Sequence, residues 1–516
     1  MKRWIRHATA WLADARERTF LAGLIALVGL GTVLRSLELS SGTLYRDDAW
    51  VALGSRVPLS MAWRMTGTAP GFTLIERTLF QWVGHTTWLV QLPTLVVSIV
   101  GMAALAALLR WWGLSRLATL FGVALLALSR IDISYATHVK PYAHDVLASI
   151  VVLAAAQWWR RGGSAWWFAG LSALCLITSF TVFPLVLGVA VVLLVQAQRT
   201  ERLRSLILPG LCGAAPTVLV AFFIRDGISP RLDSSWRASY VDYHSLQTVV
   251  SSLWKITASL LWGLGNTTPG IHVPLFGRVF QVMMLVLLVA AFRRRAQATL
   301  AIAALVAAYA SAALHMAPLG TGRTDAYLHP ALIILLAIGA EEFVRLLRSR
   351  SALLARVSVA ALALAMTLTG VDRSLHRQPY PGGDLLPVIS EAAKVLNQYG
   401  AVLVEGTARW PWALYGANDL SIRFSHEYNT GFAPLTRDKN IVLMPGTIIE
   451  GGYDPTGAIA KLNRAPIVLY VQTSDWPAMG HPLARAAHAG CYSMAPTQPR
   501  QTPGYETQLW IYGCSK

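Results

Sequence analysis

The sequence predicts a polytopic α-helical membrane protein of about eleven transmembrane helices, with a C-terminal extracytoplasmic α/β domain. The chain has 516 residues, of which 54% are hydrophobic and only 14% are charged, whereas a soluble domain carries about 25% charged residues. Apolar runs of about 20 residues, enough to cross a bilayer, recur along most of the chain. These runs, and the short Arg clusters between them, indicate a membrane protein.

The apolar runs define the expected spans. The first, near 20–37, follows a basic N-terminal segment and precedes no clean small-residue cleavage site, so we expect a retained anchor. Further spans are expected near 89–109, 117–130, 139–159, 165–182, 183–197, 206–224, 276–292, 298–314, 328–344 and 357–372. They form a membrane region over residues 1–372, with outer loops near 38–88, 130–140, 225–275 and 315–327.

The segment 71–84 (GFTLIERTLFQWVG) is apolar but short, and it contains Glu76 and Arg77. We interpret it as a helix that lies at the outer interface and does not cross the membrane. The Arg clusters then all fall on the inner side, and the longer outer loops hold fewer basic residues. Positive-inside bias therefore predicts a cytoplasmic N-terminus, with the C-terminal region on the outer side of a cytoplasmic (inner) membrane.

The net charge of +18 raises the question of a nucleic-acid partner. The basic residues lie in short clusters between apolar runs, not along one amphipathic face. Their placement is a topology signal, so the expected partner is the lipid bilayer and not a nucleic acid.

Residues 373–516 differ in composition from the membrane region, with mixed charge and frequent Pro and Gly. We expect an amphipathic helix over 384–400, and buried strands at AVLVEG, NIVLMPG and PIVLYVQ. Alternating strands and helices indicate a small α/β domain. Cys491 and Cys514 both lie in it, on the oxidising side of the membrane, so we expect them to form a disulfide. Cys175 and Cys212 lie in predicted spans and are expected to be apolar packing residues.

The first outer loop contains LYRDDAWVALGSR, in which Asp47 and Asp48 are adjacent. Neighbouring carboxylates raise one another's proton affinity. Such a pair suits general-base catalysis, metal binding or contact with a hydroxylated substrate. The alternative is an N-cap and first-turn acid of a helix in a solvated loop.

The second outer loop, SRIDISYATHVKPYAHDVL, places His138, Lys140, Tyr142 and Asp145 where a span begins. Pro141 suits a first helical position. An acidic residue just inside a span is a functional-site candidate. The alternative is that Lys140 snorkels and Tyr142 belongs to an interfacial aromatic belt.

The third outer loop, PLGTGRTDAYLHP, carries Arg323, Asp325 and Tyr327, followed by His329 at the mouth of a span. The guanidinium of Arg323 can bind a phosphate through paired hydrogen bonds. The alternative is a local pair between Arg323 and Asp325 that only orders the loop.

The order of these motifs resembles the GT-C superfamily of polyprenyl-phosphate-sugar-dependent membrane glycosyltransferases. The protein O-mannosyltransferases and the lipid A aminoarabinose transferases are the most similar groups. The resemblance covers about residues 20–372. It implies that Asp47 stands at the Asp of a DE-type pair, with Asp48 where Glu is more familiar. Lys140-Pro141-Tyr142 matches an (R/K)PY element, and GRTDAYLHP resembles a late Arg motif.

The resemblance implies a hexosyl- or pentosyltransferase that inverts the anomeric carbon. Its donor would be a sugar linked to a polyprenyl phosphate, and its acceptor an extracytoplasmic glycan, lipid or protein. Lys140 and Arg323 would stabilise the leaving phosphate, His138, Tyr142, Asp145, Asp325 and Tyr327 would line the donor site, and Asp47 with Asp48 would activate the acceptor hydroxyl. This scheme requires no cofactor, although Asp47 and Asp48 could hold a divalent metal.

Two other classes remain open from the residues alone. A transporter or flippase of a lipid-linked or anionic substrate would also carry intramembrane charges, but it would commonly show inverted repeats, which we do not find in the sequence. A non-catalytic membrane scaffold would leave the three polar loops unexplained.

The predicted topology has a direct test. The basic clusters place their loops in the cytoplasm, so the C-terminus is expected outside. A reporter fused after Lys516 should therefore be active if it works outside the cytoplasm and inactive if it works only inside. Fusions of alkaline phosphatase and of a cytoplasmic fluorescent protein measure this. Activity of the cytoplasmic reporter alone would contradict the whole assignment of loops.

Overall fold

The computed structural model describes two compact units, which consist of residues 1–38, 93–221 and 236–377, and of residues 39–92, 222–235 and 378–516. Within them the described residues are 15–39, 42–44, 46–62, 64–65, 69–84, 86–199, 203–227, 236–265, 274–349, 351–354, 357–358, 386, 389–390, 400–404, 409–425, 431–436, 441–443, 467–473, 491–496, 500–502 and 505–514. Each unit is described by itself.

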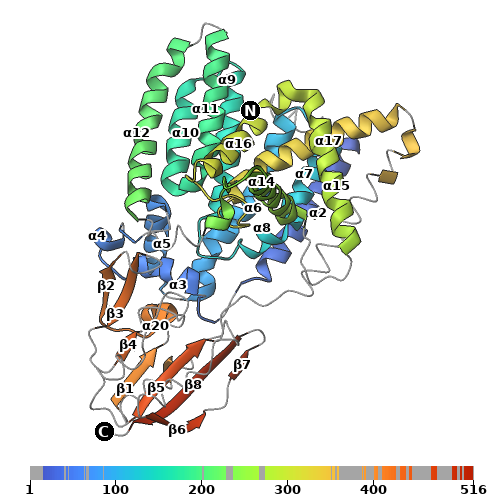
Figure 1. The fold of residues 1–516 in the computed structure, drawn as a ribbon. Helices are drawn as coiled ribbons and strands as arrows, with labels where there is room; N and C mark the ends of the chain where they lie inside the picture. The colour runs from blue at the N-terminus through green and yellow to red at the C-terminus, as the bar shows by residue number, and fades with distance from the viewer. Residues whose placement is uncertain are drawn as a thin grey trace, which may run out of the picture. The chain divides into compact units, whose positions relative to one another are not determined.

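The first unit is a bundle of helices (Figure 1). Its helices are α2 (Ala15–Ser36), α6 (Thr87–Trp111, from Pro93 onward), α7 (Arg116–Leu128), α8 (Arg130–Ser134), α9 (Tyr142–Arg160), α10 (Ala165–Thr178), α11 (Phe183–Arg199), α12 (Leu203–Gly227, up to Ala221), α14 (Leu246–Gly265), α15 (Pro274–Ala291), α16 (Arg295–Ala313) and α17 (His329–Arg348). Single 3₁₀ turns lie at η2 (Phe180–Val182), η3 (Arg237–Ser239), η4 (Phe292–Arg294) and η5 (Ala326–Leu328).

Helices occupy the predicted spans up to residue 344. Among the residues that the structure describes, four stretches are long and apolar enough to cross a membrane: Ala15–Ser36, Thr87–Trp111, Phe180–Arg199 and Val282–Ala313. The prediction of an integral membrane protein is therefore confirmed. The last predicted span, 357–372, lies almost wholly outside the described residues, so the number of eleven stays a prediction. Helix α14 falls inside the predicted loop 225–275, where the sequence analysis did not identify a helix.

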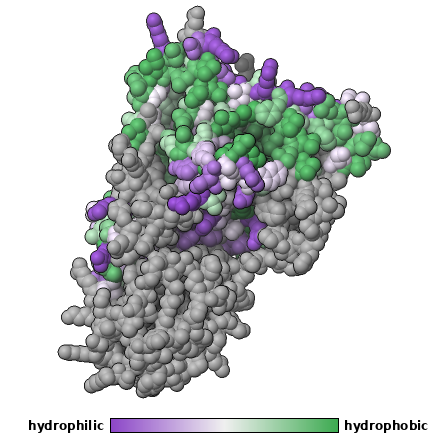
Figure 2. Space-filling model, viewed as in Figure 1, coloured by the Kyte–Doolittle hydropathy of each residue, from purple (hydrophilic) through white to green (hydrophobic). Residues whose placement is uncertain are grey.

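The surface of the bundle fits a lipid environment. Large apolar side chains are exposed along α10 and α11, among them Trp166, Trp167, Leu174, Leu187 and Val191. Figure 2 shows apolar residues over much of the described surface of the bundle. A soluble protein rarely exposes so much contiguous apolar surface to water. In a membrane, lipid tails contact this surface instead of water.

Small residues let the bundle helices approach closely. A Cβ built at Gly188 of α11 would lie 2.3 Å from the carbonyl oxygen of Ala303 on α16, and one built at Gly339 of α17 would lie 1.9 Å from that of Leu287 on α15. Close backbone approach at small residues is the usual mode of helix packing in membranes. Glycine is therefore required at both crossings, which hold α16 and α17 in the bundle.

The second unit combines the first outer loop with the C-terminal segment. Its helices are α3 (Arg46–Ala52), α4 (Leu59–Ala62), α5 (Pro70–Val83) and α20 (Arg409–Tyr415), with a 3₁₀ turn η1 (Leu53–Ser55). Its strands are β1 (Gly400–Val404), β2 (Leu420–Phe424), β3 (Phe432–Thr436), β4 (Ile441–Leu443), β5 (Ile467–Thr473), β6 (Cys491–Pro496), β7 (Arg500–Thr502) and β8 (Tyr505–Cys514).

The main sheet has the order β4-β1-β5-β8-β6, with β7 paired to β8. Strands β4, β1 and β5 are parallel and correspond to the three strands expected from the sequence. Strand β8 pairs antiparallel with β5, and β6 and β7 each pair antiparallel with β8. A separate antiparallel pair, β2 and β3, was not predicted. The expected helix over 384–400 lies mostly outside the described residues.

The register of the sheet bears on the predicted disulfide. Cys491 of β6 and Cys514 of β8 are directly opposite each other in the antiparallel ladder. Directly opposed Cα atoms in such a ladder are about 4.5–5.5 Å apart, within the range that a disulfide spans.

We therefore expect Cys491 and Cys514 to be oxidised in the mature protein. The bond should stabilise this part of the sheet by about 3 kcal/mol, because it closes a loop of moderate length in the unfolded chain. Peptide mapping by mass spectrometry without reduction measures the pairing. Recovery of both thiols free from protein exported to an oxidising compartment would contradict the prediction.

Candidate functional site

A buried guanidinium joins the ends of two helices to the middle of a third in the first unit. Arg35 is in the last turn of α2 and is fully buried. Its Nη1 donates to the carbonyl oxygens of Gly31 at 3.1 Å and Ala127 at 2.9 Å, and its Nη2 donates to that of Leu126 at 2.8 Å. Its Nε donates to Ser98 Oγ of α6 at 2.8 Å. The last carbonyls of a helix lack partners within the helix, so Arg35 caps α7 and joins it to α2 and α6.

A buried ion pair lies next to this junction. Asp132 is on α8, and Nδ1 of His329, the first residue of α17, lies 3.0 Å from both of its carboxylate oxygens. Burial alone would raise the pKa of Asp132, but the charge and hydrogen bond of His329, the hydrogen bond with Ser129 and the charge of Arg35 together hold that pKa below its ordinary value. Because the carboxylate is ionised, it accepts the proton of Nδ1. The charge of Arg35 also acts on it.

The third outer loop is a tight turn ordered by Asp325. Gly320 and Gly322 both have positive φ, at 80° and 70°, which favours glycine. The buried carboxylate of Asp325 accepts from the backbone N–H of Gly320 and from Thr321 Oγ1, both at 3.1 Å. Burial raises the pKa of Asp325, against the lowering effects of His329 and of these hydrogen bonds. Asp325 therefore orders the turn that carries Arg323, whose side chain is exposed.

The second outer loop brings its polar residues together in another way. His138 and Lys140 are both buried, and the backbone N–H of Lys140 donates to the carbonyl oxygen of His138 at 2.8 Å. The ring of Tyr135 contacts those of His138 and Tyr142, with centroids 5.1 and 4.6 Å apart. His138, Lys140 and Tyr142 are thus held in one ordered segment.

Asp145 lies deeper, in the first turn of α9. It is fully buried, and its Oδ1 accepts a hydrogen bond from Ser179 Oγ, between α10 and η2. The contact ties the start of α9 to its neighbour in the bundle. Tyr327 of η5 is also buried, and η5 packs against α9.

The second and third loops meet around a small hollow of the first unit. Its lining includes Asp132, Tyr135 and Tyr142, together with Ser98 of α6 and Ala326 of η5. Helices α6, α8 and α9 place polar groups at this hollow, and α7 and η5 contribute apolar side chains to it. They meet at the helix ends that the sequence analysis assigns to the outer side.

The first outer loop places its acids on a short helix of the second unit. Asp47 and Asp48 are both in the first turn of α3, as the N-cap alternative expects. Asp47 is half-buried, but Asp48 is fully buried, so it is not a solvated surface acid. Favourable interaction with the helix N-terminus contributes only about 0.3–1 kcal/mol at an exposed site, which does not account for burying a carboxyl group.

Helix α3 is supported by the C-terminal segment. Trp50 of α3 contacts Trp410 of α20 and Phe432 of β3, with ring centroids 6.4 and 5.9 Å apart. Arg56 donates to the carbonyl oxygens of Ala413 and Leu414 in the last turn of α20 at 3.0 and 2.6 Å, and to that of Ala417 just after it at 2.7 Å. Residues more than 350 positions apart therefore form one small core under the acid pair.

Glu76 of α5 is an acid that the sequence analysis did not select. It is 2% exposed, and neither of its carboxyl oxygens has a hydrogen-bond partner among the described residues. The adjacent Arg77 instead donates to the carbonyl oxygens of Gly54 and Val57. Burial, and then the charge of Asp48, raise the pKa of Glu76 to about 8.

The predicted site residues thus fall into two groups. His138, Lys140, Tyr142, Asp145, Arg323, Asp325 and Tyr327 belong to the first unit, and Asp47 and Asp48 belong to the second. Within the described residues, no three His, Cys, Asp or Glu side chains are grouped so that they could hold a metal ion. A metal at Asp47 and Asp48 stays a prediction, as does a shared cavity for Asp47, Lys140 and Arg323.

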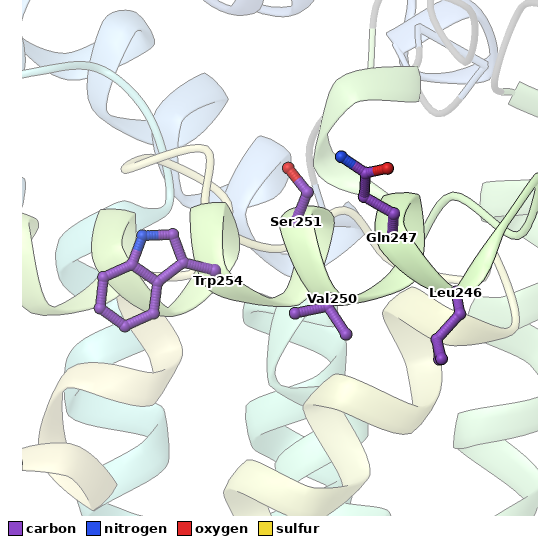
Figure 3. Close-up of a pocket in the computed structure, with 5 residues that line it drawn as sticks. All are labelled: Leu246, Gln247, Val250, Ser251 and Trp254. Atoms are coloured by element: carbon purple, nitrogen blue, oxygen red, sulfur yellow. The ribbon is translucent and has the colours of Figure 1, made fainter.

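A more open hollow lies along α14 (Figure 3). It is lined by Leu246, Gln247, Val250, Ser251 and Trp254, and has a volume of about 520 Å³. Leu246, Val250 and Trp254 are exposed on successive turns of the helix. The lining has no charged group, so this hollow does not offer the chemistry of phosphate or proton transfer.

Comparison with solved structures defines the class of fold. No protein-family model matches the chain, and no curated protein is similar to it. The chain is similar in fold to solved structures of ArnT, a fold that the resemblance carried by the loop motifs predicts.

Two of the similar solved structures are those of ArnT from Cupriavidus metallidurans. In the apo state ArnT matches with a TM-score of 0.55 and 13% identity, over 98% of each chain. ArnT bound to undecaprenyl phosphate matches with a TM-score of 0.51 and 13% identity, over 94% of this chain and 97% of that one. At this identity the likeness is one of fold.

Sequence reasoning missed Arg35, Asp132 and Glu76 as members of these clusters. Each carries a signal in hindsight: Arg35 is a charge at the end of an apolar span, Asp132 lies within the quoted second-loop motif, and Glu76 interrupts an apolar segment. A charge inside or beside a span is a functional-site candidate. The contacts that distinguish these residues are all tertiary.

The buried pair gives a prediction about stability. We expect Asp132→Asn and His329→Gln each to lower the free energy of unfolding by about 3 kcal/mol or more, because each leaves a buried polar partner uncompensated. The double variant should lose less than the sum of the two. Thermal unfolding of the purified protein in detergent measures all three. Strictly additive losses would show that the two side chains do not interact.

Proposed function

We propose that the protein is a glycosyltransferase that moves a sugar from a polyprenyl-phosphate-linked donor to an extracytoplasmic acceptor. The acceptor would be a glycan, a lipid or a protein, and the transferred sugar a hexose or a pentose. The reaction would invert the anomeric carbon, because the acceptor hydroxyl attacks opposite the departing phosphate.

The observation that carries the proposal is the match of nearly the whole chain to the fold of ArnT, including ArnT bound to undecaprenyl phosphate. A match of fold does not by itself assign chemistry. The polar loops add the chemistry, because they bring a lysine, an arginine and paired acids to a membrane protein of this fold.

Lys140 and Arg323 are proposed to bind the donor phosphate. As the glycosidic C–O bond breaks, negative charge grows on the phosphate oxygens, and preorganised cations stabilise it best. Lys140 is held in the ordered 138–140 segment, and Arg323 on the turn that Asp325 orders. Neither cation therefore requires a large rearrangement of its backbone as the charge develops.

Asp47 is proposed as the base that takes the proton of the acceptor hydroxyl, with Asp48 beside it. Asp47 is half-buried and so can reach a substrate, whereas Asp48, the next residue on the same short helix, is fully buried. The proton goes to a carboxylate, the new C–O bond forms at the anomeric carbon, and the electron pair of the broken bond leaves with the polyprenyl phosphate. A divalent ion at these acids would serve to orient the hydroxyl.

The other predicted site residues are proposed to shape the donor site. His138 and Tyr142 belong to the ordered segment around Lys140, and Tyr142 lines the hollow near Asp132. Asp145, Asp325 and Tyr327 are buried, so they would act mainly by holding the loops in place. The reaction would take place on the outer face of the cytoplasmic membrane, where positive-inside bias puts these loops.

The proposal is tested by comparing substitutions at the base and at the phosphate site. We expect Asp47→Asn to lower the rate of transfer by a factor on the order of 10²–10⁴, because the amide keeps its size but cannot accept the proton. Donor binding should largely survive. Lys140→Met and Arg323→Gln should weaken donor binding as well as turnover, since a phosphate contact acts in the ground state and the transition state.

The measurement is transfer from labelled polyprenyl-phosphate sugar in membranes, with donor binding measured separately. Asp48→Asn is the internal comparison: if the acids hold a metal, Asp47 and Asp48 variants should both be severely impaired, and chelation should have the same effect. A folded Asp47→Asn protein that transfers sugar at the normal rate would exclude Asp47 as the base.

A further inference from the structure

Helix α14 is an element that the proposed mechanism does not use. It falls in the predicted outer segment 225–275, and its exposed side forms the hollow of Figure 3. Leu246, Val250 and Trp254 on this side are 81%, 59% and 58% exposed. Large apolar side chains favour burial, so this row of side chains requires an occupant other than water.

The start and the later half of α14 are both tied to one end of the bundle. Just before the helix, Tyr243 Oη donates to the carbonyl oxygen of Ala313, the last residue of α16, at 2.7 Å. Further along, Ser259 Oγ donates to the carbonyl oxygen of Gly320 in the third outer loop, also at 2.7 Å. A helix that crossed the membrane would have its two ends on opposite sides. Helix α14 therefore runs along the outer end of the bundle.

The orientation of α14 in the figures agrees with these contacts. In Figure 1, α9, α10 and α11 are seen along their length, whereas α14 is foreshortened, and in Figure 3 α14 crosses the direction of the helices behind it. Among the described residues, α14 is not one of the four stretches that are long and apolar enough to cross a membrane. It is thus an in-plane helix and not a span.

The exposed side of α14 carries two rows of side chains, one apolar and one polar. The apolar row consists of Leu246, Val250 and Trp254, and the polar row of Gln247, Ser251 and Lys255. Residues four positions apart lie on the same face of a helix, so the two rows run side by side along α14. This is the pattern of a helix that lies in a membrane interface, with one row toward the acyl chains and the other toward headgroups and water.

The neighbours of α14 indicate lipid as the occupant. Helix α14 packs against α15, which itself exposes Val282 and Val289 and belongs in part to a stretch that is able to cross a membrane. Helix α14 thus adjoins a surface that lipid tails contact. Exposed aromatic side chains such as those of Tyr243 and Trp254 are typical of the interface. The ammonium group of Lys255 is complementary to the phosphate of a phospholipid.

We propose that α14 lies in the outer interface of the bilayer, with its apolar row among lipid acyl chains and Lys255 at a phospholipid phosphate, and that it holds the third outer loop at this depth. Besides the hydrogen bond of Ser259, the two segments make a close backbone contact: a Cβ built at Gly320 would lie 3.0 Å from Cα of Ile256. The loop carries Arg323, so its depth bears on the proposed function, whereas the contact with lipid does not depend on that function.

The experiment places a spin label on each row. Val250→Cys and Gln247→Cys are made in a Cys175→Ala, Cys212→Ser background, which removes the free cysteines of the described residues. The parent without either new cysteine measures residual labelling. In vesicles of phosphatidylethanolamine and phosphatidylglycerol, collisions of the label with oxygen, which concentrates in lipid, are compared with collisions with a water-soluble nickel chelate. We expect the ratio of oxygen to nickel accessibility to be on the order of tenfold higher for Val250→Cys, because an apolar face in the interface lies about 5–10 Å deep.

The other outcomes overturn the contact with lipid. Equal ratios for the two variants, with ready access of the nickel chelate, would show that the apolar row faces water. Protection of the Val250→Cys label from both agents would show that protein covers the row, a second copy of the chain included. Gln247 is the matched control because it lines the same hollow on the same helix.

A second measurement tests the link to the third outer loop. A label at Arg323→Cys reports the depth of the loop, and Val250→Asp places in the apolar row a charge that is costly among acyl chains. We expect Val250→Asp to draw α14 toward water and to raise the nickel accessibility of the label on the order of twofold, with no change for Gln247→Asp. An unchanged label in Val250→Asp would overturn the link. Val250→Ser is the milder variant if the aspartate prevents folding.

Neither measurement uses sugar transfer, so the two proposals fail separately. If the wild type transfers no sugar, the proposed function fails, and the labels still decide where α14 lies. If the labels place the apolar row in water, this inference fails, and the proposed function stands.

Discussion

The bundle depends on the burial of one guanidinium. A charge in an apolar interior is stable only if its hydrogen bonds and its charge are both satisfied. Arg35 meets the first condition with four hydrogen bonds, to the ends of α2 and α7 and to Ser98 of α6. The ionised Asp132 contributes to the second, and Asp132 in turn binds His329 at the start of α17. The helix ends around the polar loops are therefore positioned by electrostatics as well as by packing.

The second unit solves a different physical problem. A helix of seven residues such as α3 is not stable alone, because nucleation of a helix is costly and few hydrogen bonds follow. The aromatic contacts of Trp50 with Trp410 and Phe432, and the capping of α20 by Arg56, supply the missing stability from the C-terminal segment. The C-terminal residues thus support the loop that carries the acid pair. No motif in their sequence indicates this structural role.

The sequence predicted the features that depend on composition and short spacing. Apolar length located the spans up to residue 344, and short apolar runs located β1, β4 and β5. The loop motifs identified Lys140, Arg323 and the acid pair as candidates. Periodicity could not reveal that Asp325 orders its turn through Gly320 and Thr321, or that Asp145 binds Ser179. It also could not select Arg35 or Glu76, because their importance lies in contacts between distant segments.

Asp132 and Glu76 are both buried, but their surroundings shift their pKa values in opposite directions, and the difference has a physical consequence. Asp132 is buried beside a hydrogen-bonding imidazole and a guanidinium, so it stays ionised and contributes a permanent charge to the structure. Glu76 is buried without a hydrogen-bond partner among the described residues and next to another acid, so it favours its neutral form. A carboxyl group of the first kind is suited to hold helices in place, since its state does not change near neutral pH. One of the second kind can gain or lose a proton at little cost, which is the property that acid–base chemistry at a membrane surface requires.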